Sequence, residues 1–546
     1  MATVEQGSPA REVLNQPPPL EGYNVFAENR PLAESLRREG GDAFEERAHA
    51  LGERAGTAEA LERGRLANEY PPILRTHDRF GNRIDEVEFH PAWHELLKLS
   101  VQAGVHALPW REPVPGAQVG RAAMMLAMSG VESGTGCPLS MTYAGVPALR
   151  AQPELAEEWE PRLTSLEYDP RSMPAEDKRG SLMGMAMTER QGGSDVRANT
   201  TVARPLNGGG PGAEYELDGH KWFCSAPMCD VFLVLAQADS GMSCFLLPRW
   251  TPDGERNRFH LQRLKDKLGN RSNASSEVEF DGAWARLVGE EGRGVPTIIK
   301  MVNHTRLDCV LGSAGLMRAA VAQATHHAAH RAAFGKLLID QPLMQNVLAD
   351  LCVESEAATL TAMRLARAMD EDDPFRRLGL AVSKYWVCKS ATWHVGEALE
   401  CLGGNGYVEL SGMPRLYREA PLNSIWEGSG NVNCLDVLRG MVRSPEAVDA
   451  FFGEVDSAGG AVADYTAGIK RELSDLDEIE FRARRIVESM ALALQASLLV
   501  RHGDPAVADA FVATRLTGDH GRSLGTLPRG IDCERIVERH RPKLAA

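Results

Sequence analysis

The sequence predicts an α+β fold that is mostly helical, with one compact β domain between helical segments. Three observations support this. Apolar residues recur at three- and four-residue spacing before about residue 180 and again after about residue 294. Between these segments lie short stretches of alternating or β-favouring residues, separated by turn formers. From about residue 444 the helical periodicity continues in a further block.

Length and composition set the broad class of the protein. A chain of 546 residues is too long for one core, so we expect several domains. The net charge of −15 gives no general attraction to a polyanion. Ten cysteines without a CxxC pair favour reduced thiols in the cytoplasm. The first residues resemble no signal peptide, and no apolar run reaches the ~20 residues of a membrane span, so we expect no membrane partner.

Four domains are expected along the chain. Residues 1–180 carry stretches such as "GRAAMMLAMSGVESG" and form an N-terminal helical domain. Residues 181–295, with "EYELDGHKWFCS" and "VFLVLAQA", form the β domain. Residues 296–443 contain long Ala-rich helices with short links, which indicates a helical bundle. Residues 444–546 form a C-terminal helical domain whose end we expect to be less ordered.

Two motifs of the β domain carry groups that suit a ligand. In "MGMAMTERQGGSDVRANT" the hydroxyls of Thr188 and Ser194 accompany a turn with exposed backbone N–H groups. Such donors suit a flavin or a pyrophosphate, although Gly-Gly-Ser-Asp is also a common surface turn. In "GHKWFCSAP", Phe223 and Ser225 add an aromatic face and a hydroxyl, or they belong to an ordinary aromatic strand.

The bundle contains three further motifs with open interpretations. Arg331, before "AAFGK", either holds a phosphate bidentately or caps its own helix. Gly403 and Gly404 either stop a helix or allow close approach to a ligand. Glu427, in "IWEGSGN", is a helix cap, a surface acid or a base directed at a ligand. Acids in apolar surroundings usually have a partner or a task.

No metal site is expected. His326 and His330 have the i, i+4 spacing of a helical zinc pair. No Glu lies between them in a metalloprotease pattern, and no third ligand follows at a metal-like spacing. A structural role is therefore favoured for both histidines.

The order of the motifs resembles that of the acyl-CoA dehydrogenase family. "TERQGGSD", "HKWFCS" and "KLGNRSN" are followed by "RAAFGK", "LGGNGY" and "WEGSGN", over about residues 60–440. The segments "NQPPPLEGYN", "GTAEALERGRLANEYPP" and "PRLYREAPLNSIWEGSGN" are similar to the branch of that family induced by DNA alkylation. The resemblance implies a helical N-terminal domain, a central β-barrel, a four-helix bundle and an extra C-terminal helical domain.

The resemblance also implies a reaction. Glu427 stands where the family has the catalytic base that removes the α-proton of an acyl-CoA, while the β-hydride passes to FAD. Another branch of the family has an acid before the helix arginine. Here Thr305 precedes Arg306, so Glu427 is the sole candidate base and Arg306 is assigned to substrate binding. Trp426 is bulkier than the usual Tyr, which implies slow, isovaleryl-like activity.

FAD is the cofactor that the resemblance implies. Arg331 and Phe334 should reach the FAD of a neighbouring subunit, which implies a homotetramer. The expected FAD contacts are Met185, Met187, Thr188, Gly193, Ser194, Phe223, Cys224, Ser225, Arg331, Phe334, Gly403, Gly404, Trp426, Gly428 and Asn431.

The branch also implies binding of double-stranded DNA through the C-terminal domain. That domain has more acidic than basic residues, so only a local stripe of arginines would serve. The arginines can instead pair with nearby acids such as Glu480, Glu488, Glu534 and Glu538. The candidate DNA-binding residues are Arg482, Arg485, Arg515 and Arg522.

Two functions are therefore expected from the sequence. The first is a DNA-binding flavoprotein that protects against or responds to alkylation, with weak dehydrogenase activity. The alternative is a metabolic dehydrogenase of short or branched acyl-CoA without a DNA role. They differ in whether the cavity beside Glu427 admits a thioester and whether the arginines converge.

Overall fold

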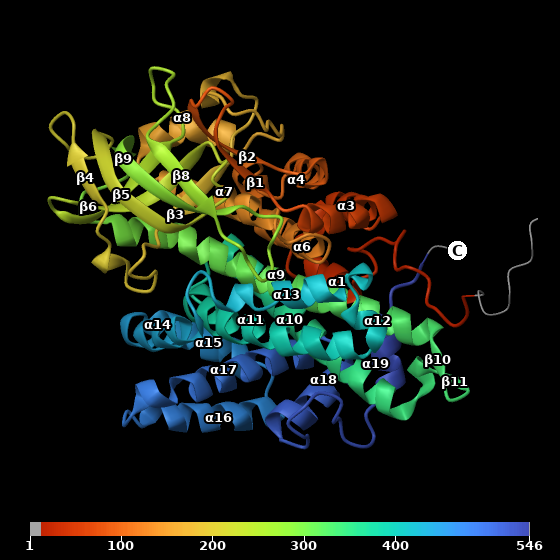
Figure 1. Cartoon of the computed structure of the whole chain (residues 1–546). Coiled ribbons are helices and arrows are strands. Elements are labelled where there is room, and N and C mark those ends of the chain that lie inside the picture. Colours follow the sequence, from red (N-terminus) through yellow and green to blue (C-terminus); the bar gives the residue numbers. More distant parts are fainter. Residues whose placement is uncertain (1–12, 545–546) are drawn as a thin grey trace, which may run out of the picture.

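The computed structural model describes residues 13–544. Figure 1 shows strands β1 to β9 gathered at one end, long helices through the middle and the C-terminal helices at the other end. The order of elements is the predicted one. Residues 1–12, on which the expectation about a signal peptide largely rests, lie outside the described residues. Among the described helices, none is long and apolar enough to cross a membrane.

The N-terminal part consists of helices interrupted by one hairpin, and most of the helices bury an apolar face. α6 is buried along its whole length, because it packs against α9 on one side and α2 and α10 on others. The elements are α1 (Arg30–Arg38), α2 (Glu45–Ala55), α3 (Ala58–Glu69), β1 (Ile73–His77), β2 (Arg83–Glu88), α4 (Pro91–Ala103), α5 (Leu108–Arg111), α6 (Ala117–Ser129), α7 (Gly136–Leu149) and α8 (Pro153–Leu163).

The β1–β2 hairpin was not predicted in this part, which was expected to be helical. Its strands pair antiparallel, and the Asp78 side chain accepts hydrogen bonds from the N–H groups of Phe80 and Asn82 to shape the turn. Arg83 donates to the Leu261 carbonyl at 2.9 Å, so the hairpin lies against the β domain. Helical spacing on both sides of the hairpin hid the short alternating strands.

The β domain is a closed barrel, as predicted. β6 pairs with β7, β7 with β9, β9 with β5 and β5 with β4. A single parallel pair, Val202 with Gln237, closes the ring between β4 and β6. β3 adds to β6 and β8 to β9. The strands are β3 (Met183–Ala186), β4 (Val202–Pro205), β5 (Glu214–Ser225), β6 (Val231–Ala238), β7 (Gly241–Pro248), β8 (Phe259–Leu264) and β9 (Ser275–Leu287).

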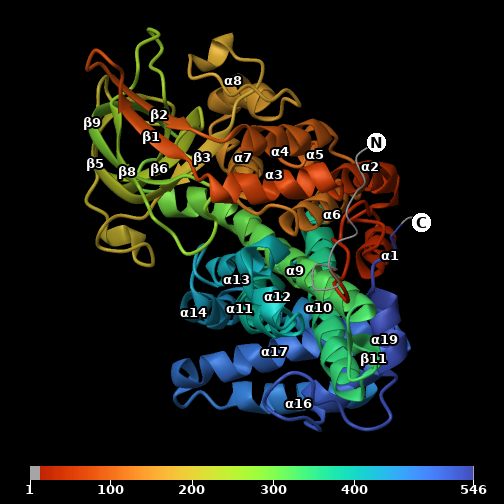
Figure 2. The same ribbon diagram turned by 45° about the vertical axis from the view of Figure 1, so that its right-hand side comes forward.

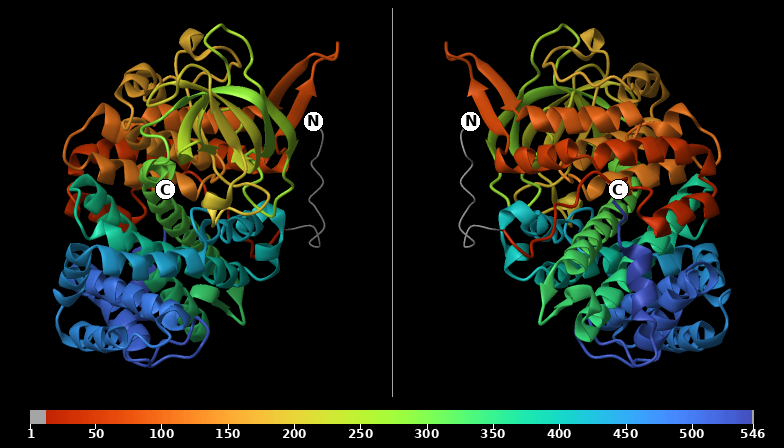
Figure 3. Two further views of the ribbon diagram at one scale, coloured as in Figure 1. Left: turned by 90° about the vertical axis from the view of Figure 1, so that its left-hand side faces the viewer. Right: turned by 90° about the vertical axis from the view of Figure 1, so that its right-hand side faces the viewer.

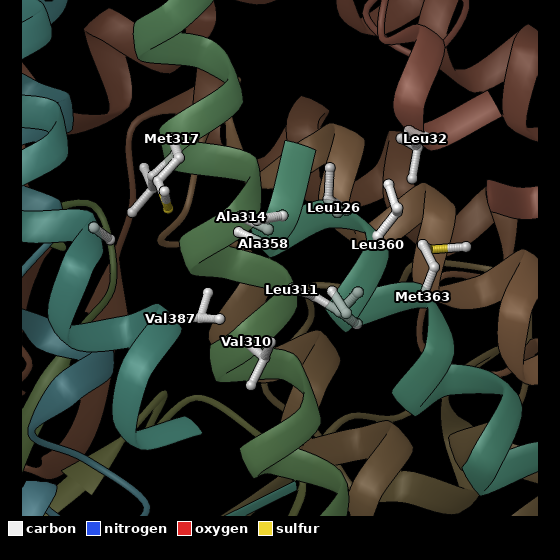
Figure 4. Packing of buried hydrophobic residues seen from close by; sticks show 14 of the residues in the cluster. Leu32, Leu126, Val310, Leu311, Ala314, Met317, Ala358, Leu360, Met363 and Val387 are labelled. Carbon is white, nitrogen blue, oxygen red and sulfur yellow. The ribbon is translucent and has the colours of Figure 1, made fainter. Parts of the chain in front are cut away.

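α9 is the central helix of the molecule and runs from the barrel through the bundle (Figure 2). Its neighbours come from all sides, so its apolar residues are not confined to one face. Val310, Leu311 and Ala314 are fully buried against α6, α10 and α11 (Figure 4). At Gly315 an added Cβ would lie 2.4 Å from the Leu126 carbonyl oxygen, so glycine permits the close α6–α9 contact.

The bundle combines four helices with short connecting elements. The main helices are α9 (Gly294–His330), α10 (Pro342–Asp370), α11 (Arg376–Glu400) and α14 (Gly430–Arg443). The connections contain β10 (Ala332–Ala333), β11 (Lys336–Leu337), α12 (Gly404–Tyr407) and α13 (Met413–Glu419).

The C-terminal helices cover the side of the bundle remote from the barrel (Figure 3). They are α15 (Pro445–Asp456), α16 (Gly460–Ser474), α17 (Ile479–His502), α18 (Pro505–Phe511) and α19 (Cys533–His540). α19 packs back on α10, where Arg539 pairs with Glu34 and with the buried Glu356. The expectation of a less ordered end is therefore wrong up to residue 544, because buried ion pairs fix α19.

Candidate active site

Glu427 lies in a tight loop just before α14 whose backbone is strained. Its φ angle is +55°, which is left-handed and unusual for a residue with a side chain, and Gly428 follows at +98°. Lys384 of α11 is 1% exposed and donates from Nζ to the carbonyls of Trp426 and Gly428, at 2.7 and 2.5 Å. The Asn433 amide also donates to the Gly428 carbonyl. These bonds hold the conformation that turns Glu427 inward.

The Glu427 carboxyl faces the middle of α9. Its Oε2 accepts a hydrogen bond from Thr305 Oγ1 at 2.7 Å, and its backbone carbonyl accepts one from Arg306 Nε at 3.0 Å. Burial raises the pKa of this carboxyl; the Thr305 hydroxyl and the positive charges of Lys384 and Arg306 only partly oppose the rise. A carboxylate with a raised pKa is a stronger base than an ordinary glutamate.

Arg306, predicted to bind substrate, is committed to protein partners. It is 6% exposed and pairs with Asp436 of α14 at 2.8 Å, while Arg377 holds the same carboxylate at 3.0 Å. With its Nε on the Glu427 carbonyl, the guanidinium fixes the loop of the base. These contacts fix Arg306 against the loop that carries Glu427, and its expected role in substrate binding stays a prediction.

The two β-domain motifs lie side by side. The N–H of Trp222 donates to the Thr188 carbonyl at 2.8 Å, which joins the segment after β3 to the end of β5. The pairing of β5 with β9 is irregular between Lys221 and Cys224. Such a bulge redirects side chains. Accordingly Phe223 is 50% exposed, while Cys224 is fully buried.

The β-domain motifs and the Glu427 loop border the same region. Trp426 packs against the barrel core that Met185 and Met187 also border. Cys137 of α7 lies close to Ser225 and within electrostatic reach of Glu427; burial raises the pKa of its thiol to about 11, so the thiol is neutral. This region of barrel and bundle thus combines apolar side chains, the Glu427 carboxyl, the neutral Cys137 thiol and the Lys267 ammonium.

This set of groups fits a flavin. Phe223 is half-exposed, with Lys265 Nζ 4.6 Å from its ring centroid. Thr188 lies on the segment bonded to the neighbouring Trp222, and Ser194 is exposed on the turn that follows. At Gly193 an added Cβ would lie 2.4 Å from Thr188 Oγ1, so only glycine lets this turn fold against the hydroxyl. Hydroxyl and ammonium donors near an exposed aromatic ring suit a cofactor rich in acceptor oxygens and nitrogens.

The remaining expected FAD positions lie on exposed loops. Phe334 is fully exposed at the tip of the β10–β11 hairpin, and Gly403 has a φ of +57° with open space around it. Arg331 donates to the Asn15 carbonyl at 2.7 Å. Asn431, in the first turn of α14, accepts a hydrogen bond from Arg484 of α17 at 2.8 Å.

The predicted DNA-binding arginines do not form one surface stripe. Arg515 is buried and pairs with Asp350 and Glu354 of α10, so its assignment to DNA is wrong. Arg482 is held by Glu472 and by carbonyls of the preceding loop. Arg485 and Arg522 are exposed. The partners of Arg515 are more than 150 residues away in sequence, so neighbouring residues could not reveal them.

The two candidate zinc histidines bond to backbone carbonyls. A ring nitrogen of His326 lies 2.8 Å from the Pro18 carbonyl, and one of His330 lies 2.8 Å from the His326 carbonyl.

Several residues of the site were not singled out from the sequence. Thr305 was noted only as the position of a missing acid, and Lys384, Asn433, Asp436 and Cys137 were not considered. Lys384 carried a usable signal, since it is a single lysine within the apolar helical stretch "LGLAVSKYWV". The others have no local signal because their role depends on contacts between distant helices.

Comparisons with known proteins agree with this geometry. Residues 15–170 match the family model of the adaptive response protein AidB N-terminal domain. Residues 184–283 match the acyl-CoA dehydrogenase middle domain and residues 292–442 its C-terminal domain. AidB of Escherichia coli (strain K12) is 44% identical, covering 92% of this chain and 94% of that protein.

Solved structures extend the likeness. The structure of Caenorhabditis elegans ACDH-11 in complex with C11-CoA has a TM-score of 0.83 and 28% identity, covering 97% of both chains. The alignment therefore includes most of the C-terminal helices. Butyryl-CoA dehydrogenase of Megasphaera elsdenii shares the fold, with a TM-score of 0.60 and 22% identity over 74% of this chain and 98% of that one. The chain belongs to the acyl-CoA dehydrogenase family, as an FAD-dependent oxidoreductase of its AidB branch.

Proposed function

We propose that Glu427 is the base that removes the C2 proton of an acyl-CoA thioester. The observation that carries this is the Glu427 carboxyl itself. It projects from a strained left-handed loop, is partly buried, and has a neutral hydroxyl rather than a cation as its hydrogen-bond partner. The neighbouring Asp436, by contrast, is held in an ion pair with Arg306, so its carboxylate is not free to take a proton.

Each neighbour of Glu427 has a separate task in this proposal. Lys384 and Arg306 fix the loop through its backbone carbonyls and leave the carboxyl free to accept a proton. The Thr305 hydroxyl donates to the carboxylate and so opposes the rise in pKa that burial causes. Trp426 and the barrel core exclude water from one side. FAD, when bound, supplies the acceptor for the hydride from C3, and the product is a trans-2-enoyl thioester.

We assign the FAD contacts within the subunit to the two β-domain motifs and the Glu427 loop. Met185, Met187 and the backbone of Cys224 would line the ring, with Phe223 against its face. Thr188, Ser194 and Ser225 would donate hydrogen bonds, and Trp426 with Gly428 would close the opposite side. The close packing of Gly193 and the bulge that exposes Phe223 support this assignment.

Arg331, Phe334, Gly403 and Gly404 belong to a proposed homotetramer interface. Both loops lie beside one N-terminal segment, because Asn15 bonds to Ala332 and Asn405 bonds to Gln16. The surface around them exposes large apolar side chains, which mark interaction sites. These side chains are Phe334, Leu343, Tyr407 and Leu410, each at least 80% exposed.

The proposed substrates are short or branched acyl-CoAs, with a low rate of dehydrogenation. Trp426 is fixed by a hydrogen bond from its Nε1 to Asn423 at 2.9 Å, so its bulk cannot easily move away from the acyl group. ACDH-11 was solved with C11-CoA, so long acyl chains are the alternative to test. We place the activity in the cytoplasm, since the cysteines of the described chain are free thiols.

The experiment is an anaerobic titration of the FAD-loaded protein with isovaleryl-, butyryl- and undecanoyl-CoA, followed by flavin absorbance. Bleaching by isovaleryl- or butyryl-CoA at lower concentration than by undecanoyl-CoA is the expected result. Preference for undecanoyl-CoA would overturn the short-chain assignment. No bleaching by any of the three, with FAD bound, would overturn the dehydrogenase activity.

A second proposed function is binding of double-stranded DNA in the response to alkylation damage. The support is the 44% identity to AidB and the match to the adaptive-response N-terminal model. The available cations are Arg485 and Arg522, both exposed. If each contacts phosphate, Arg485→Ala and Arg522→Ala should each reduce the slope of log K against log salt by about 1 in duplex-binding anisotropy. Duplex binding that does not weaken as the salt concentration rises, or no duplex binding at all, would refute this role.

A further inference from the structure

A cavity with polar and apolar lining lies away from the Glu427 site. It has a volume of about 60 Å³ and is lined by the segment before α1, α3, the end of α6, α9 and α13. On α9 it begins at Gly315, ten residues and about 15 Å from Thr305. Val310, Leu311 and Ala314 are packed core residues in between (Figure 4). The cavity is therefore separate from the proposed active site.

The cavity contains polar groups without partners. Asn29 is 1% exposed, and neither its Oδ1 nor its Nδ2 has a hydrogen-bond partner among residues 13–544. Nη1 of Arg415 is also buried and unpartnered in that range. Buried side-chain amides and guanidinium groups are normally satisfied, so three such atoms at one cavity indicate a missing occupant.

The cavity is also positively charged. Arg318 and Arg415 both line it, and within residues 13–544 neither has a carboxylate oxygen within 4.0 Å. Arg318 donates to the carbonyls of His540 and Glu28, and Arg415 donates to that of Val131. Carbonyls satisfy donors but do not neutralise charge. Burial lowers the pKa of both arginines, although a guanidinium stays protonated in proteins.

The acids nearest to Arg415 are already engaged elsewhere. Glu132 accepts hydrogen bonds from Asn68, Ser272 and backbone N–H groups of the loop after α6. Glu419 accepts two from Asn270. Glu132 and Glu419 share a small adjoining cavity with Arg415 and oppose the fall of its pKa, as Glu28 does for Arg318. Among the described residues, however, none of these acids forms an ion pair with either guanidinium group.

We propose that this cavity binds a small carboxylate anion, with its oxygens on Arg318, Arg415 and Asn29. A volume of about 60 Å³ holds about four water-sized groups, which matches an acid of acetate size. A guanidinium fork is the usual receptor for a planar carboxylate. Tyr23, Gln323 and Ser411 also line the cavity. The apolar part of the wall suits a short alkyl portion: Val25, Leu61, Leu126, Ala127, Val131 and Leu416.

The test measures thermal unfolding of the FAD-loaded protein with sodium acetate against sodium chloride at equal ionic strength. Acetate should raise the transition temperature in a saturable manner, since a ligand at a hundred times its Kd changes the folding equilibrium about 100-fold. Asn29→Leu should abolish the acetate effect yet fold, because it removes unpaired polar atoms and fills the cavity. Arg415→Gln should abolish it too.

Arg418→Gln is the matched control, since Arg418 lies on the same helix but pairs with the exposed Glu409. It should keep the full acetate effect. An acetate effect that is absent, or equal in wild type and Asn29→Leu, would mean that the cavity holds only water and would overturn the proposal. Phosphate acting as well as acetate through the same residues would overturn the carboxylate assignment. Reduction of the flavin by acyl-CoA should be unchanged in Asn29→Leu, which separates this test from that of the active site.

Discussion

Arg515 gives a sharp test of the fold, because sequence and structure assign it opposite roles. As a DNA-binding residue it would be exposed. In the structure its side chain is 10% exposed and lies against two carboxylates of α10, Asp350 and Glu354, each 2% exposed. Burial raises the pKa of Glu354, and the charge of Arg515 opposes that rise. One guanidinium therefore neutralises two buried acids.

Replacing Arg515 by Leu keeps the apolar stem and removes the charge. Two carboxylates would be left buried without their cation, and breaking a buried pair in this way costs about 3–5 kcal/mol. The Gly525 N–H donates to Asp350 at 2.8 Å and offsets only a small part of this loss of stability. The loss should be smaller at acidic pH, because protonated acids need no counter-ion. Arg522→Leu, an exposed control, should change the unfolding free energy by no more than about 0.5 kcal/mol.

The assay is urea unfolding followed by circular dichroism, with duplex binding measured on the same samples. The structure predicts a lower midpoint for Arg515→Leu than for Arg522→Leu. Duplex affinity of folded Arg515→Leu, measured without urea, should equal that of wild type. If Arg515→Leu is as stable as wild type but loses DNA affinity, the buried position of Arg515 is refuted.

Three further predictions follow from the described contacts. Thr305→Val should raise the pKa of Glu427, because a donor to the ionised carboxylate is lost. In a plot of flavin-reduction rate against pH, the acid limb should then move to higher pH. An unchanged pH profile would contradict the contact. Lys384→Met should remove both hydrogen bonds to the Glu427 loop and slow flavin reduction at least tenfold in a folded protein. Wild-type rates in this variant would show that the loop keeps its conformation without Lys384. Burial lowers the pKa of His540, but Cys352 and Glu356 raise it to about 9. Protonated His540 therefore stabilises the fold below pH ~6.5, and this contribution of at most about 3 kcal/mol is lost as the pH rises to about 9. His540→Gln should flatten that part of the plot of unfolding free energy against pH, and an equal slope in the variant would exclude His540 as the cause.

Much of the fold could be predicted from periodicity and motif order. Helix, β-barrel, bundle and extra helices follow in the expected order, because each segment carries its own apolar period. The β1–β2 hairpin was missed because two five- or six-residue strands are shorter than the helical windows around them. The docking of α19 was missed because it depends on Glu34 and Glu356, which are far away in sequence.

The residues of the site also divide into those that local motifs reveal and those that depend on contacts between distant segments. Glu427, Phe223 and Thr188 stand in local motifs, so sequence alone could single them out. The Thr305–Glu427 contact spans 122 residues and exists only once α9 and α14 are packed together. The same reason explains Arg306. Its position in the motif led to its assignment to substrate binding, whereas its ion-pair partner, Asp436, lies 130 residues away in sequence.

The most direct test of the central claim compares anaerobic flavin reduction in wild type, Glu427→Gln and Glu446→Gln by stopped flow. Glu446 is an exposed acid in the first turn of α15 and serves as the control. We predict that all three proteins retain FAD, that an active acyl-CoA reduces the flavin in wild type and Glu446→Gln, and that Glu427→Gln shows no reduction. Reduction at the wild-type rate in Glu427→Gln would contradict the assignment of Glu427 as the base.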